Sequence, residues 1–281
     1  MERPWSHKTP WVGRVRSGKR RGYWVLVLGF PWQGRVLPCF ILRFSSQTLQ
    51  QQGRSRNMEH MQAVDRLRQV LGDKPLMLDR EFGYTEFLQY LTCRGVQYVI
   101  RLNTRAHIDD AQGRRLTLLL ARGETKVWRN VWYRGEVAVH VAGTWVPDAP
   151  EPLFVVTSID PWRAVRLYLT RMTIEASFRD LKNLLRMDDN MSRSERIVDL
   201  LLWIALLAYA LVVWVGEFVR DHVLTHWERP RYSGCFVLLR RPDRTRGPTF
   251  LEALRHAWRE FCRLVDALML LSYFVDEGIP P

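Results

Sequence analysis

Residues 75–102, PLMLDREFGYTEFLQYLTCRGVQYVIRL, decide the fold class. The apolar run 75–78 predicts a short buried strand, and residues 84–93 carry apolar side chains at helical spacing. Residues 95–102 are rich in β-branched and aromatic side chains and predict a second strand. A strand, a helix and a strand in succession form a β-α-β unit, which is typical of an α/β fold.

Asp79 directly follows the first of these strands. Ligands bind beyond the carboxyl ends of strands in open α/β sheets, so an acidic side chain at this point is a candidate for chemistry. An aspartate there also commonly caps the turn that follows a strand. Its position alone therefore leaves both roles open.

A second group of candidates lies in residues 168–182, YLTRMTIEASFRDLK. At about 100° per residue on a helix, Tyr168, Arg171, Glu175 and Lys182 share one narrow face. The pattern predicts a polar stripe beside an apolar one, with Glu175 at the edge of a cleft. The alternatives are an ordinary solvated face of paired charges and, for the tyrosine, packing in the core.

The rest of the chain is interpreted outward from these two segments. Residues 23–30 and 37–44 predict an antiparallel hairpin, and residues 58–71 predict an amphipathic helix. Short alternating pieces between 103 and 152 predict a small antiparallel insertion, after which residues 152–158 form another buried strand.

The helix that carries the polar stripe is predicted to begin with Asp160 as its N-cap and Pro161 at its first position. We expect four parts in the chain. These are residues 1–103 (first part of the core), 104–152 (the insertion), 153–227 (second part of the core) and 228–281 (a basic loop and a C-terminal helix).

Charge points to a polyanionic partner. The chain of 281 residues has a formal net charge of +13, and neutralising phosphates releases counterions from nucleic acid. The densest basic cluster, here called the basic cluster, predicts contacts with the DNA backbone, although a solvated arm is the alternative. Its members are Arg14, Arg16, Lys19, Arg20 and Arg21.

The uninterrupted apolar run 200–215 favours a buried core helix, because a membrane span needs about 20 such residues. A membrane-associated protein is the less favoured alternative. The four cysteines have no zinc-site spacing and indicate free thiols in a reducing cytoplasm. No apolar leader is visible at the N-terminus.

Taken together, these residues resemble the IS4 family of bacterial DNA transposases. Tyr168, Arg171, Glu175 and Lys182 match its signature Y-x2-R-x3-E-x6-K, and residues 78–83 resemble its D-R-x-F-G block. The resemblance implies an RNase H-like core, a mixed sheet flanked by helices.

The same resemblance implies three catalytic carboxylates, a D-D-E set, that hold two divalent ions, Mg²⁺ or Mn²⁺. Asp79 and Glu175 match two of the three positions. Arg171 and Lys182 would contact phosphates, and Tyr168 would position the DNA end. The expected partner is double-stranded DNA at the terminal inverted repeats of an insertion sequence, with a homo-oligomer on paired ends in the bacterial nucleoid.

One feature departs from the family pattern, because no aspartate precedes Asp65. The first catalytic aspartate and the first core strand are therefore expected to be missing, as in a truncated or frameshifted reading frame. We expect such a chain to be weakly active or inactive alone. The alternative is a non-catalytic DNA-binding remnant.

Overall fold

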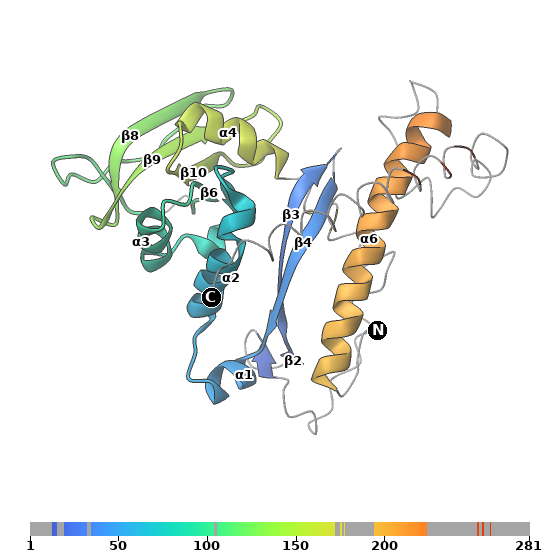
Figure 1. Cartoon of the computed structure of the whole chain (residues 1–281). Coiled ribbons are helices and arrows are strands. Elements are labelled where there is room, and N and C mark those ends of the chain that lie inside the picture. The colour runs from blue at the N-terminus through green and yellow to red at the C-terminus, as the bar shows by residue number, and fades with distance from the viewer. Residues whose placement is uncertain are drawn as a thin grey trace, which may run out of the picture. The chain divides into compact units, whose positions relative to one another are not determined.

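The computed structural model consists of two compact units (Figure 1), and each is described by itself. The first unit comprises residues 1–5, 25–43 and 173–281, and the second comprises residues 6–24 and 44–172. The structure describes residues 13–15, 20–32, 35–103, 106–171, 175, 177 and 194–223, together with residues 252, 255 and 259. The predicted basic loop and most of the predicted C-terminal helix lie outside these residues.

A mixed six-stranded sheet forms the centre of the second unit. Its strand order is β5-β6-β10-β9-β8-β7, and only the pair β5 and β6 is parallel. The strands are β5 (Leu76–Leu78), β6 (Tyr98–Arg101), β7 (Ile108–Asp109), β8 (Thr125–Tyr133), β9 (Val137–Thr144) and β10 (Leu153–Thr157). This mixed sheet with flanking helices is compatible with an RNase H-like core.

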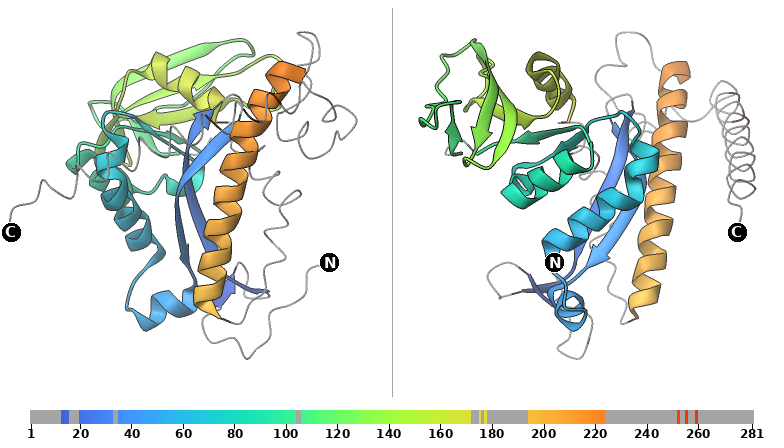
Figure 2. Two further views of the ribbon diagram at one scale, coloured as in Figure 1. Left: turned by 45° about the vertical axis from the view of Figure 1, so that its right-hand side comes forward. Right: turned by 60° about the vertical axis from the view of Figure 1, so that its left-hand side comes forward.

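Helix α4 (Pro161–Thr170) lies along one face of this sheet, as Figure 2 shows from two directions. Ala164 and Val165 of α4 belong to one buried cluster with Val99, Ala142 and Val155 of three neighbouring strands. The alternate strand residues Tyr98, Ile100 and Val156 are buried as well. Both faces of the sheet are therefore covered, as expected for its near-continuous apolar strands.

The unit also contains the helices α2 (Arg56–Leu71) and α3 (Thr85–Cys93). Helix α3 connects the parallel strands β5 and β6, so the predicted β-α-β unit is confirmed. The unit also contains β1 (Gly13–Val15), β2 (Arg20–Gly22) and α1 (Ser46–Gln51).

The predicted insertion is part of the same sheet. Strand β10 pairs antiparallel with β6 on one side and with β9 on the other, so the hairpin β8-β9 extends the sheet that begins with β5. The predicted domain boundaries stay predictions.

In the first unit, β3 (Trp24–Trp32) and β4 (Arg35–Phe44) form the predicted hairpin, whose end residues Trp24 and Phe44 belong to the second unit. The hairpin is a two-stranded sheet of its own among the described strands. Arg43, at the end of β4, donates to Asp199 at 2.5 Å and pairs with Glu195. The Arg43 side chain is only 6% exposed, so these bonds join the hairpin to the start of the next helix.

That helix, α6 (Glu195–Val223), contains the apolar run 200–215 and is longer than the run itself. Its buried face includes Val198, Leu202, Leu206, Tyr209 and Val213. Its other face exposes Ile197, Leu200, Leu201, Trp203, Ile204 and Leu207. The prediction of a buried core helix therefore holds for one face only, because the run is apolar all round while its partners cover one side.

By length and composition alone, residues 195–221 of α6 could also cross a membrane. Such a test is passed by core helices of water-soluble proteins too, and it is weak support for a span. The helix continues beyond the apolar run at both ends into charged residues, so the uninterrupted apolar stretch stays at residues 200–215.

Candidate functional site

Asp79 lies at the carboxyl end of β5, as the sequence predicts. Its side-chain Oδ1 accepts a hydrogen bond from the Arg80 backbone N–H at 2.8 Å and caps a short 3-10 turn, η1 (Arg80–Phe82). Phe82 is buried, and its ring centroid lies 4.7 Å from that of His60. The turn that carries Asp79 is thus fixed to the core by an aromatic contact.

Arg171 from the distant end of α4 reaches the same carboxylate. Its Nη2 lies 3.2 Å from Asp79 Oδ2, and the arginine side chain is 12% exposed while that of Asp79 is 41% exposed. The Arg171 guanidinium also lies over the Tyr168 ring, 5.5 Å from the centroid. A cation over an aromatic face is stabilised by the ring quadrupole, so Tyr168 helps to orient Arg171 toward Asp79.

Tyr168 itself is part of the core. It is 2% exposed and belongs to the cluster that joins α4 to β6, β9 and β10. Its direct contact with DNA stays a prediction, because in this structure its ring faces protein.

The predicted helix from Asp160 is confirmed as far as Thr170, and most of its predicted second half lies outside the described residues. The N-cap is confirmed, since Asp160 accepts from Arg163 N–H at 3.0 Å with Pro161 following. Helix α4 ends at Thr170, where the Thr170 hydroxyl donates to Leu167 O at 2.6 Å and competes with the helical pattern. Tyr168 therefore lies in α4, and Arg171 follows its last residue directly.

Glu175 is helical and exposed, and it belongs to the first unit. Two residues on, the buried Ser177 hydroxyl accepts the Val36 N–H at 2.9 Å, which ties this segment to the hairpin strand β4. Asp79 and Glu175 lie in different units, so their pairing stays a prediction.

The other predicted DNA contacts are only partly described. Arg14 lies on β1 and pairs in register with Arg21 on β2, and Arg20 pairs with Val15. Arg16, Lys19 and Lys182 lie outside the described residues.

Asp79 has the donor chemistry that a hard divalent ion prefers. Its carboxylate is partly exposed, and its two oxygens offer about four lone-pair positions, of which the two contacts above use part. Within the described ranges, no three His, Cys, Asp or Glu side chains gather closely enough to hold a metal. Asp79 thus fits an ion as one ligand of a larger set.

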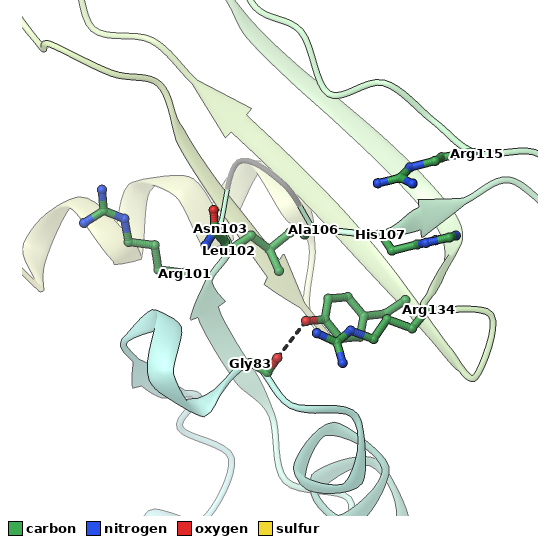
Figure 3. A pocket seen from close by; sticks show the side chains of 9 residues that line it. Gly83, Arg101, Leu102, Asn103, Ala106, His107, Arg115 and Arg134 are labelled. Atoms are coloured by element: carbon green, nitrogen blue, oxygen red, sulfur yellow. Dashed lines mark hydrogen bonds between the residues drawn. The ribbon is translucent and has the colours of Figure 1, made fainter. Parts of the chain in front are cut away.

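A basic pocket lies beside this turn, and the sequence did not predict it. It measures about 540 Å³, and its lining includes Arg101, His107, Arg115 and Arg134 (Figure 3). No sequence signal could find it, because these residues are spread over four segments that meet only when β6, β7 and β8 enter one sheet.

Comparison with known families agrees with the geometry. Residues 43–211, more than half of the chain, match the family model described as a transposase DDE domain. The matched range contains Asp79, Tyr168, Arg171, Glu175 and Lys182. No curated protein matches the chain.

Proposed function

This chain belongs to the transposase DDE domain family, and we propose that it acts on the ends of an insertion sequence as a transposase of the IS4 type. The observation that carries this proposal is the pair Asp79 and Arg171. Two residues 92 positions apart by their numbering, each in a motif of the IS4 pattern, meet at the carboxyl edge of a mixed sheet. A ligand-binding carboxylate is expected at that edge.

DDE transposase domains generally depend on divalent metal ions. We propose that Asp79 and Glu175 hold Mg²⁺, or Mn²⁺ in its place, because these ions take carboxylate oxygens. Such ions stabilise the attacking and leaving oxygens of a phosphoryl displacement. The proposal requires the two units to bring both carboxylates together when DNA is bound.

Arg171 is proposed to move between two partners. Without DNA its guanidinium neutralises the Asp79 carboxylate at 3.2 Å. With a metal ion on Asp79, the same guanidinium becomes available to a phosphate, for which the fork of an arginine is well suited. Tyr168 keeps the guanidinium at this place in both states.

Lys182 and the basic cluster defined above are proposed to contact DNA phosphates, and Tyr168 to help position the DNA end. These contacts would supply affinity without sequence readout. The proposed target is a terminal inverted repeat, bound by a homo-oligomer on paired ends in the bacterial nucleoid. A net charge of +13 supports a polyanionic partner.

We propose further that the 281-residue chain alone cuts DNA weakly or not at all. It supplies two carboxylates of the D-D-E set and has no aspartate before Asp65. A non-catalytic DNA-binding protein is the second candidate, and the same observation favours it.

The test measures binding and nicking on one DNA. Duplexes that carry the terminal repeats flanking the gene, and scrambled duplexes of equal length, are titrated with the chain over a range of KCl concentrations. We expect salt-sensitive binding, tighter on the repeats, with little nicking in Mg²⁺ or Mn²⁺. Robust nicking that Asp79→Asn abolishes would contradict the proposed weak activity, and an absence of DNA binding would contradict the function itself.

A further inference from the structure

The basic pocket of about 540 Å³ lies at the same edge of the sheet as Asp79. Because β5 and β6 are parallel, the residues that follow them emerge at one edge. Asp79 follows β5, and Asn103 of the pocket lies two residues after β6 ends. Gly83, four residues after Asp79, lines the pocket directly (Figure 3).

Hydrogen bonds between separate segments hold the lining of the pocket together without a ligand. The Tyr133 hydroxyl donates to Gly83 O at 2.6 Å, which joins the end of β8 to the turn after Asp79 (dashed line in Figure 3). The Arg134 N–H donates to His107 O at 3.0 Å, which joins the next residue to the segment before β7. The pocket therefore needs little rearrangement to receive a ligand.

The backbone at Arg134 is held in an uncommon conformation. Its φ is +53°, in the left-handed region that residues other than glycine seldom adopt. Such a conformation is strained and persists only where the surroundings enforce it. Here it places an arginine, not a glycine, at the start of the β8-β9 turn.

Two guanidinium groups give the pocket its charge. Arg101 is engaged elsewhere, since it pairs with Glu151 at 2.6 Å and points away from Arg115 and Arg134 in Figure 3. In the part of the chain that the structure describes, no ion pair involves Arg115 or Arg134, and both are exposed. Two positive charges facing a preformed hollow favour an anion.

Among the described residues, the nearby Asp109 carboxylate pairs with His107 and with neither of these arginines. The His107 Nε2 lies 2.8 Å from Oδ1 of Asp109, whose side chain is 7% exposed. The Asp109 carboxylate is thus turned toward His107 and away from solvent. Its backbone also forms an isolated antiparallel bridge with that of Arg115, which fixes the segment that carries this arginine.

We propose that Arg115 and Arg134 of this pocket bind a phosphate group of the DNA backbone. This phosphate would lie next to the part of the DNA strand that is bound at Asp79. The inference rests on the proposed function, because it takes the polynucleotide as the source of the phosphate. Arginine forks bind phosphate oxygens by paired charge-assisted hydrogen bonds, and the volume leaves room for the attached sugar.

The experiment compares two double variants of equal charge. Arg115→Gln with Arg134→Gln removes the pocket charges, and Arg66→Gln with Arg68→Gln removes two exposed charges on α2, in the same unit. We expect the pocket variant to bind DNA about tenfold less tightly, and its slope of log affinity against log salt to fall by one to two. The α2 variant should change neither by more than about twofold.

Ethylation interference then locates the contact. A backbone phosphate whose ethylation weakens wild-type binding should lose its influence in the pocket variant and keep it in the α2 variant. Equal effects of both double variants, or an unchanged interference pattern, would overturn the proposal. If the double variant unfolds, Arg115→Gln alone carries the same test.

A second experiment, with small phosphate ligands, distinguishes failure of this proposal from failure of the proposed function. Inorganic phosphate and a dinucleotide are titrated against the wild type and followed by ³¹P line broadening. Binding of the dinucleotide that the pocket variant loses supports the pocket even if long DNA is not bound, and in that case only the proposed function fails. Absence of phosphate binding together with unchanged DNA affinity would refute the pocket.

Discussion

At the scale of single residues, the contact between Arg171 and Asp79 joins the two motifs of the site. Both groups are charged and Arg171 is only 12% exposed, so each is stabilised by the other. Replacing Arg171 by Gln should lower the free energy of unfolding by about 1 kcal/mol, measured by urea denaturation. Arg166→Gln, an exposed change on α4, should cost within about 0.5 kcal/mol.

A double-mutant cycle sharpens this prediction. If the pair is formed in solution, Asp79→Asn should reduce the effect of Arg171→Gln by roughly 0.5 kcal/mol or more. Strictly additive effects would show that the two side chains do not interact.

His60 makes the same region sensitive to acid. Burial, with a smaller contribution from the nearby Arg56 charge, lowers the pKa of His60 from 6.5 to about 4. Between these values the unfolded chain binds more protons than the folded one, so the free energy of unfolding falls as pH falls from about 6.5 to about 4. The expected loss is about 3 kcal/mol, complete below the folded pKa.

Urea denaturation at a series of pH values measures this loss. His60→Phe, in a ring cluster that includes Phe82 and Phe87, should flatten the curve in that window, although its stability at pH 7 can be lower. An unchanged slope in the variant would assign the acid sensitivity to another group.

At the scale of elements, the start of α4 depends on one cap. Asp160 accepts the Arg163 N–H at 3.0 Å and also pairs with Arg129 at 2.7 Å. Asp160→Ala should lower the melting temperature, whereas Asp160→Asn keeps a capping oxygen and should lower it less. Thermal unfolding of both variants measures this. If Asp160→Asn lowers the melting temperature as much as Asp160→Ala, the ion pair with Arg129 is the dominant contact.

The two faces of α6 give a second prediction at this scale. Leu202 is 2% exposed and Leu200 is 58% exposed. Leu202→Ala should lower the free energy of unfolding by roughly 2 to 5 kcal/mol, and Leu200→Ala by less than about 0.5 kcal/mol. Equal losses in denaturation curves would mean that both faces are covered, as in a membrane or a stable complex.

Local sequence patterns predicted most of the helices and strands. They did not predict which distant strands pair with one another. The β-α-β unit from β5 to β6, the hairpin β3-β4 and the cap at Asp160 each follow from neighbouring residues. The position of β10 between β6 and β9 depends on contacts far apart in the chain, which a strand pattern does not encode. For this reason the insertion looked separate although it extends the central sheet.

In the candidate site, too, local features were predictable and contacts between distant segments were not. The position of Asp79 after a strand was predictable, because it needs only the strand and its end. The helical wheel placed Tyr168 beside Arg171, and the alternative of core packing for this tyrosine is confirmed. The wheel also assumed a helix as far as Lys182, and α4 ends at Thr170.

For the whole molecule, the two carboxylates of the proposed metal site belong to different units. One carries Asp79 and Arg171, and the other carries Glu175, which Ser177 and Val36 fix to the hairpin. The proposed function predicts that ion binding by the chain on DNA depends on both carboxylates.

The most direct measurement is Mn²⁺ binding to the chain on terminal-repeat DNA, followed by electron paramagnetic resonance. The account predicts that Asp79→Asn and Glu175→Gln each weaken binding at least about tenfold. Glu81→Gln, at an exposed carboxylate two residues from Asp79, should leave it unchanged. Equal Mn²⁺ binding by all four proteins, or a loss confined to the Glu81 variant, would contradict the account.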